Sequence, residues 1–237
     1  MNGMVVRGVG GRRDEYRPLV STLVDSARPL DVARGLRDHF GLDHYYLADL
    51  DGILGEIPHW EAIGWLVADG FRLDVDMGVR ELNQAERLLR RGTHRVIVAL
   101  ESLADPEQLE NWVRKLGTDR MIFSLDLQGG APLVSEGSWP QEPLEIVDLA
   151  ASAGVTQLIV LDLAQVGSDT GVGTVELCRR IAEKYPLLSI TTGGGVRNAD
   201  DLRQLSGEPI DGVLIASALH DGKLSPQDLR PFVNLED

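Results

Sequence analysis

The sequence lacks several features, and each absence excludes a class of protein. It contains one cysteine, Cys178, so it can form neither an internal disulfide nor a Cys-x-x-Cys metal site. No apolar run reaches the ~18–20 residues that a membrane-spanning helix needs. The N-terminus also lacks the apolar core of a signal peptide. We therefore expect a cytoplasmic protein without a membrane partner.

Positive charge is scarce as well. The chain has 23 Lys and Arg against 37 Asp and Glu, which gives a formal net charge of −14. Because nucleic acids bind basic surfaces, this excess of acid argues against a nucleic-acid partner. The lysines are Lys115, Lys184 and Lys223, and none falls at the end of a predicted strand. A Schiff-base mechanism is therefore not expected.

From residue 44 onward, short apolar runs alternate with amphipathic segments. The runs are rich in Val, Ile and Leu with little polar alternation, which is typical of parallel strands buried on both faces. The alternation predicts an α/β domain with a parallel sheet, either closed as a barrel or open and doubly wound. The predicted strands are 44–49, 72–76, 95–100, 121–126, 157–162, 187–191 and 212–216, and the predicted helices are 82–91, 106–116, 142–153, 175–184 and 199–205.

An internal repeat favours the barrel. Residues 76–80 (Asp-Met-Gly-Val-Arg) precede a helix and a strand, and residues 193–197 (Gly-Gly-Gly-Val-Arg) do the same 117 positions later. Asp49 and Asp162 each close a strand and lie 113 positions apart. Two half-barrels of four βα units explain this spacing, whereas an open sheet does not. We therefore predict one (βα)8 (TIM) barrel domain over 1–237, with half-barrels of about 1–118 and 119–237.

The same repeat indicates that the first strand of the barrel is missing or truncated. Gly130 follows the fifth predicted strand, and its counterpart in the first half is Gly3. The counterpart of Asp126 would then fall two positions before Met1. A missing strand leaves its neighbours with unpaired edges, which is unfavourable. Either the start codon is misassigned, which we favour, or the chain closes its barrel in another way.

The strongest candidate binding motif is the glycine run 193–195, together with Ala216-Ser217 after the last strand. Triple glycine alone can mark only a tight turn. Consecutive glycines, however, let backbone N–H groups approach a phosphate, and small residues opposite leave room for it. TIM barrels often bind phosphate after strands seven and eight. The predicted phosphate-binding residues are Gly194, Gly195, Ala216, Ser217 and Ser168.

The first half has lost the equivalent motif. Asp76-Met77 stands where the second half has Gly193-Gly194, and Leu100-Glu101 stands where it has Ala216-Ser217. The carboxylates would repel a phosphate dianion, and the bulky side chains would exclude it. We therefore expect a ligand with one phosphate end and a different other end.

Acidic residues are expected around the mouth of the barrel, where burial and mutual repulsion raise pKa values and favour general acid–base catalysis. Alternatively, some of them cap helices or neutralise Arg80 and Arg197. A metal held by Asp76, Glu101 and Asp126 would lack a histidine ligand, so we expect neither a metal nor a cofactor. Asp126 is the expected acid–base group, its partner is Asp51, Glu101 or Asp162, and the expected substrate contacts are Asp49, Asp76, Arg80, Arg197 and Trp139, the last as a lid.

These motifs together resemble the family of phosphoribosylformimino-5-aminoimidazole carboxamide ribotide isomerase and the cyclase subunit of imidazole glycerol phosphate synthase. The likeness covers nearly the whole chain. The resemblance implies a TIM barrel whose isomerase members perform an Amadori rearrangement with an Asp after strand one and carboxylates near strands five and six. It is carried by residues 2–7, 49–52, 78–80, 124–126, 193–197 and 212–219.

The sequence departs from this family pattern in its chemistry. The strand-five Asp matches Asp126, but the strand-one Asp has no counterpart. The family's Thr at the end of strand six matches Leu161, and the Asp that follows matches Val166, so the general acid is lost. This combination resembles a divergent branch that has been linked to one-carbon cofactor metabolism (tetrahydromethanopterin or methanofuran).

Three hypotheses remain. The first is an enzyme that acts on a monophosphorylated small molecule by acid–base chemistry, in an isomerisation or a related rearrangement. The second is the isomerase of histidine biosynthesis, with another acid in place of Val166. The third is a non-catalytic protein that has kept only a phosphate pocket. The sequence identifies neither the substrate nor the oligomeric state.

Overall fold

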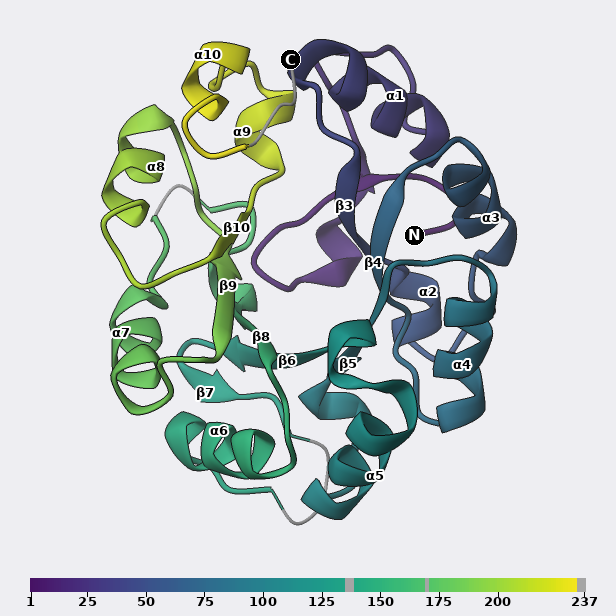
Figure 1. Cartoon of the computed structure of the whole chain (residues 1–237). Coiled ribbons are helices and arrows are strands. Elements are labelled where there is room, and N and C mark those ends of the chain that lie inside the picture. The colour runs from purple at the N-terminus through teal and green to yellow at the C-terminus, as the bar shows by residue number, and fades with distance from the viewer. Residues whose placement is uncertain (135–138, 169–170, 234–237) are drawn as a thin grey trace.

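A parallel sheet curled into a barrel, with helices around it, forms the centre of the molecule (Figure 1). The computed structural model describes residues 1–134, 139–168 and 171–233. The predicted α/β barrel is confirmed, because every ladder between successive barrel strands is parallel. In spatial order the strands are β10 (Gly212–Leu214), β9 (Ser189–Gly193), β8 (Gln157–Asp162), β6 (Met121–Gln128), β5 (Arg95–Ala99), β4 (Arg72–Asp76) and β3 (His44–Ala48).

Helices on the outside connect these strands, and most of their bounds follow from the sequence. In α5, Asp105 accepts a hydrogen bond from the backbone N–H of Gln108 and proline occupies the first turn, as helix starts favour. The predicted strand at 187–191 begins two residues later, because Leu187 is 94% exposed in a turn. The larger helices are α1 (Pro29–Phe40), α3 (Trp60–Ala68), α4 (Leu82–Arg90), α5 (Pro106–Leu116), α6 (Pro143–Ser152), α7 (Val175–Lys184) and α8 (Ala199–Leu205).

Short elements complete the chain. β7 (Ala131–Pro132) pairs antiparallel with β6. The others are the helices α2 (Leu50–Ile53), α9 (Ser217–His220) and α10 (Pro226–Leu229), and the 3-10 turns η1 (Arg13–Glu15), η2 (Leu100–Ser102), η3 (Thr118–Arg120) and η4 (Leu163–Gln165).

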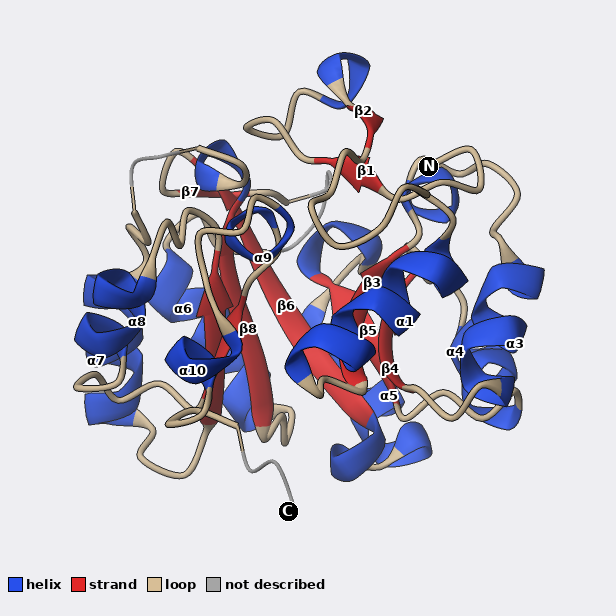
Figure 2. Cartoon of the chain, turned by 90° about the horizontal axis from the view of Figure 1, so that it is seen from above, coloured by secondary structure: helices blue, strands red, loops and turns tan. Residues whose placement is uncertain are grey.

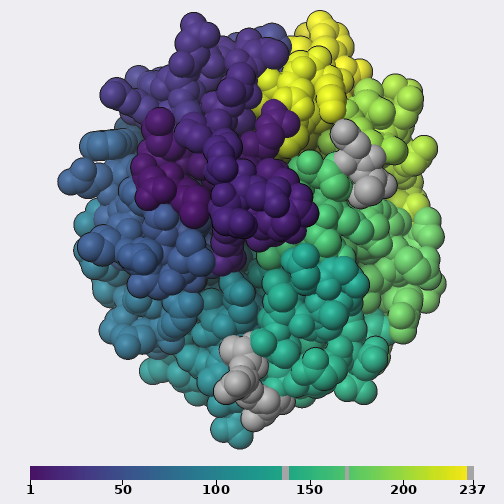
Figure 3. Space-filling model, turned by 180° about the vertical axis from the view of Figure 1, so that it is seen from behind, coloured from purple at the N-terminus to yellow at the C-terminus, as the bar shows by residue number. Residues whose placement is uncertain are grey.

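The N-terminal segment lies over the mouth of the barrel. Its strands β1 (Val6–Arg7) and β2 (Arg17–Pro18) form an antiparallel pair beyond the ends of the barrel strands (Figure 2). Seen from that side, residues from the start of the chain lie across the centre of the molecule (Figure 3). Within the described ranges, no ladder joins β3 to β10.

A groove of about 800 Å³ runs between β3 and β10. Residues along both strands line it, among them His44 and Tyr46 on one side and Gly212 and Leu214 on the other. These two strands are partly exposed, whereas β4, β5, β6 and β8 are buried over most of their length. Unlike the strands between them, β3 and β10 therefore each have one open edge.

Apolar side chains fill the barrel and the layer between its strands and the helices. Inside the barrel, Ile97, Ile122 and Ile159 form one cluster with Leu161. The thiol of Cys178 is buried, since this residue lies in α7 within the larger outer cluster. In the part of the chain described, no helix is both long enough and apolar enough to cross a membrane.

Steric crowding explains why glycine occupies equivalent positions in the two halves of the internal repeat. Gly78 has φ +63°, and a Cβ atom there would lie 2.6 Å from Cα of Ile53. Gly195, its counterpart, has φ +97°, and its Cβ would lie 2.4 Å from the backbone oxygen of Gly171. Both positions therefore require glycine for conformation and for space. The half-barrel boundaries themselves stay a prediction.

We expect Gly78→Ala to lower the free energy of unfolding by about 3 kcal/mol or more, because it adds a backbone clash to left-handed strain. Gly55→Ala is the matched control. Gly55 has φ +84°, but nothing lies within 4 Å of its Cβ position, so it should cost about 1 kcal/mol. Urea unfolding of both variants measures the difference, and equal losses would contradict the steric explanation.

Candidate functional site

A cavity of about 410 Å³ opens at the mouth of the barrel, where the strands end. Because the strands are parallel, their carboxyl ends bring residues that are distant in sequence to one edge. The polar residues around the cavity include Arg13, Tyr46, Asp76, Glu101 and Asp126. With Asp49, which also lines the cavity, four of the predicted acids therefore share one space.

Asp76 ends β4 and Asp126 lies near the end of β6, and both are almost fully buried, at 5% and 8% exposed. The hydroxyl of Ser124 donates a 2.9 Å hydrogen bond to Oδ1 of Asp126. The backbone N–H of Gly78 donates a 3.0 Å bond to Oδ1 of Asp76. Each carboxyl group is thus fixed through one oxygen.

Burial and neighbouring charge raise the pKa of both carboxyl groups. Burial raises the pKa of Asp126 to about 7, and the negative charge of Asp76 adds to the effect. Burial also raises the pKa of Asp76 to about 6, with a smaller contribution from Glu101. A group with a pKa near 7 can both donate and accept a proton at neutral pH. Asp126 therefore has the properties of a general acid–base group.

Two further side chains complete this part of the cavity. Tyr46 projects from β3, and burial, with the charges of Asp76 and Asp126, raises its pKa well above the usual value. Nη2 of Arg13 lies 3.9 Å from Oε1 of Glu101 and offsets part of the acidic charge. The sequence interpretation missed Tyr46. Alternation along residues 44–48 could have identified it, because His44 and Tyr46 share a face.

Other predicted acids bind backbone groups instead. Asp162 accepts hydrogen bonds from the N–H groups of Gly129, Gly130 and Ala164, at 2.9, 2.8 and 3.0 Å. The backbone of Asn2 donates a 2.6 Å bond to Oδ2 of Asp51. Asp162 thus has the capping role that was the alternative for these acids, and it holds the turn between β6 and β7.

Asp49 has the same kind of role, and it belongs to a histidine–carboxylate group at the mouth. Its side chain caps α2 and accepts a hydrogen bond from the backbone N–H of His59. Nδ1 of His59 lies 3.2 Å from Asp49 and 3.3 Å from Asp51. The donor atoms of these three residues are close enough together to ligate an ion. The grouping considered from sequence, Asp76 with Glu101 and Asp126, is not among the candidate metal clusters of the described residues.

The structure brings the predicted phosphate-binding residues to one groove. Gly194, Gly195, Ala216, Ser217 and Ser168 all line the space between β3 and β10. Gly194 has φ +79°, a conformation that glycine adopts without strain. In the first half, Asp76 (the equivalent of Gly193) and Glu101 (the equivalent of Ser217) line the mouth cavity instead.

The predicted substrate-binding arginines hold loops in place. Arg80 donates hydrogen bonds to the backbone oxygens of Gly78 and Ile53, at 3.3 and 3.1 Å. Arg197 donates to both carboxylate oxygens of Asp201, at 2.9 and 2.7 Å. Both side chains therefore stabilise the turns of the internal repeat.

Trp139 lies in the hydrophobic core rather than over the mouth. It is 5% exposed and stacks on Phe123, with the ring centres 6.0 Å apart. Its indole N–H donates a 3.2 Å hydrogen bond to the backbone oxygen of Leu103. A large aromatic ring gains more from this burial than from exposure on a loop, so the expected lid is corrected to a core residue.

Known proteins resemble this chain over nearly its whole length. The family model described as "Histidine biosynthesis protein" matches residues 1–225. An uncharacterised protein of Methanocaldococcus jannaschii is 32% identical over 98% of this chain and 93% of its own length. Two relatives carry the name 1-(5-phosphoribosyl)-5-((5-phosphoribosylamino)methylideneamino)imidazole-4-carboxamide isomerase. The one from Leuconostoc mesenteroides is 27% identical over 97% of this chain and 95% of its own length. The one from Desulfitobacterium hafniense is 30% identical over 94% of this chain and 90% of its own length.

The raised pKa of Asp126 predicts a pH-dependent stability. The pKa of Asp126 is higher in the folded than in the unfolded protein. Its contribution to the free energy of unfolding is therefore complete below about pH 4 and is lost as the pH rises through 7. Asp126→Asn removes the ionisation and keeps an oxygen acceptor for Ser124. We expect it to stabilise the protein by about 2–4 kcal/mol at pH 8 and by little at pH 4.

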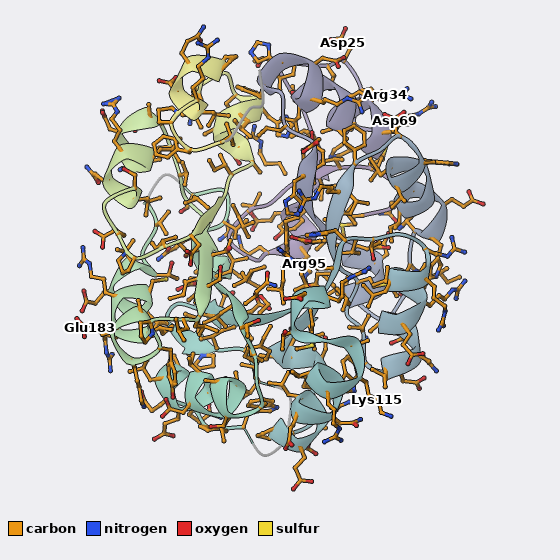
Figure 4. The ribbon with its side chains drawn as sticks, viewed as in Figure 1. Asp25, Arg34, Asp69, Arg95, Lys115 and Glu183 are labelled. Carbon is orange, nitrogen blue, oxygen red and sulfur yellow. The ribbon has the colours of Figure 1, made fainter. Side chains whose placement is uncertain are left out.

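Urea unfolding at the two pH values measures this difference. Asp25→Asn is the matched control, since Asp25 is exposed on the outside of the molecule (Figure 4). Its effect should be small at both pH values. An Asp126→Asn effect that does not depend on pH would contradict the assignment.

Proposed function

Because the chain belongs to the family of histidine biosynthesis proteins, we propose that it is an enzyme that isomerises a small phosphomonoester by acid–base chemistry. The observation that carries the proposal is Asp126, a carboxyl group buried at the mouth with a pKa of about 7. Groups tuned to the working pH are typical of general acid–base sites.

The proposed reaction is an aldose–ketose rearrangement of a phosphorylated sugar or aminosugar. Protonated Asp126 gives its proton to the ring oxygen, and the ring opens. The resulting carboxylate accepts the proton from carbon 2, which leaves an enediol or, for an aminosugar, an enaminol. Asp126 then gives that proton to carbon 1 and takes the proton of the hydroxyl on carbon 2, so carbon 2 becomes the carbonyl and carbon 1 carries the hydroxyl or the amine. Asp126 ends as it began, with its proton. Asp76 assists by raising the pKa of Asp126.

The two ends of the site suit different chemical groups. At Gly194 and Gly195 the backbone can approach a phosphate closely, and Ser217 can donate a hydrogen bond from its hydroxyl. At the other end, Asp76 and Glu101 disfavour a second phosphate dianion. A neutral or amine-bearing group fits there better, so the proposed substrate carries one phosphate.

A second candidate is the reaction named for the bacterial relatives, whose substrate carries two phosphoribosyl groups. The coverage of those relatives favours it. Asp76 and Glu101 argue against it, because they stand where the repeat would place the second phosphate site. A substrate from one-carbon cofactor metabolism stays a prediction of the family resemblance.

An isomerase assay with purified protein separates the candidates. We expect turnover of a monophosphorylated aminoaldose and none of the relatives' bisphosphorylated substrate. Asp126→Asn should lower kcat by about 100-fold or more, since general acid–base catalysis contributes that much, while binding of the phosphate ester stays unchanged. Asp25→Asn serves again as the control. Full turnover by Asp126→Asn would reject the assignment, and turnover of the bisphosphate would favour the second candidate.

The phosphate end has its own test, based on the repeat. Ser217→Glu introduces the residue type that the first half has at Glu101, and its charge should weaken binding of a sugar phosphate about 10-fold or more. Ser152→Glu adds the same charge on an exposed position of α6 and should leave binding unchanged. Isothermal titration calorimetry measures both, and equal affinities would place the phosphate elsewhere.

A further inference from the structure

The end of the barrel opposite the mouth contains a second group of ionisable side chains. His44 begins β3, Asp74 lies in β4, and His94 directly precedes β5. Neighbouring Arg95 projects near the barrel axis (Figure 4). The proposed function uses none of these residues. They are held by adjacent strands, so their spacing is fixed by the sheet.

The carboxylate of Asp74 lies between the two imidazoles. Nε2 of His44 is 2.8 Å from Oδ2 of Asp74, and Nδ1 of His94 is 3.0 Å from Oδ1. One donor atom from each residue lies within 4.8 Å of the other two. The two rings stand perpendicular, with their centres 5.2 Å apart. The three possible ligand atoms therefore lie close together.

We propose that His44, Asp74 and His94 bind a divalent transition-metal ion, with zinc as the best match. Two imidazole nitrogens and one carboxylate oxygen are a donor set that zinc accepts. Around a tetrahedral zinc such donors lie about 3.3 Å apart, so the present spacing needs only small side-chain rotations. Solvent supplies the fourth ligand, because the His44 side chain is 37% exposed.

The surrounding arginines have opposite effects. Nη1 of Arg95 lies 3.5 Å from Oδ2 of Asp74 and can orient the carboxylate, as outer hydrogen-bond partners do. Nη2 of Arg72 lies 3.2 Å from Nε2 of His94. When Nδ1 of His94 binds a metal, its proton moves to Nε2 and points toward that guanidinium. Arg72 therefore opposes metal binding, and its removal should strengthen it.

Titration of chelator-treated protein with zinc chloride tests the site. We expect saturable binding to this site in the wild type and a rise in Tm of about 5 °C at zinc concentrations well above Kd. His44→Gln and His94→Gln should each weaken binding at least about 10-fold. Arg72→Gln should tighten it about threefold. His39→Gln is the control, because His39 is exposed and belongs to neither candidate metal cluster of the described residues.

Among the described residues, the mouth contains a second histidine–carboxylate group, so His59→Gln is titrated in parallel. Loss of binding in His59→Gln but not in His94→Gln would assign the ion to the mouth and overturn the proposal. The absence of saturable binding by the wild type would overturn it too. Circular dichroism of the metal-free variants confirms folding, and Arg72→Gln tests the site without removing a ligand. No substrate is involved, so the result is independent of the proposed reaction.

Discussion

The parallel pairing of the strands is the constraint on which the site depends. It places the ends of β4 and β6 at one edge, where Asp76 and Asp126 are buried around the same cavity. Neither carboxyl group would have a raised pKa on an exposed loop, because water would solvate its charge. The fold therefore raises the pKa of both carboxyl groups by excluding solvent from them. The same burial makes ionised Asp126 unfavourable, so function and stability oppose each other at this residue.

The two halves of the barrel use the same backbone geometry for different purposes. Gly78 and Gly195 both adopt positive φ angles next to a close backbone contact. Gly194 also has a positive φ, whereas its counterpart Met77 does not, and the side chain of Met77 is fully buried in the core. Asp76 and Glu101 add negative charge at that end. Side-chain replacement, together with a different backbone conformation at this one position, thus distinguishes the proposed phosphate site from the acidic site.

Much of the fold could be predicted because the hydrophobic periodicity and helix signals are local. The observed bounds of α5 and α7 agree with those predicted from the sequence. Contacts between distant residues were harder to predict. The position of Trp139 against Phe123 and the grouping of His44 with Asp74 and His94 depend on which side chains share a barrel layer. Alternation along a strand predicts which face of the sheet a side chain lies on. The layer of the barrel in which it lies depends on the stagger between neighbouring strands, which the sequence does not show.

Tyr46 lies both at the open edge of the sheet, in β3, and beside the acid pair Asp76 and Asp126. It lines both the mouth cavity and the groove between β3 and β10, and its environment includes Asp76 and Asp126. An open strand edge can pair with another extended segment. Anything that packs against β3 would bury Tyr46 further and remove water from the acid pair. Burial is also the largest cause of the raised pKa of Asp126, so Tyr46 and Asp126 both depend on the exclusion of water from this part of the barrel.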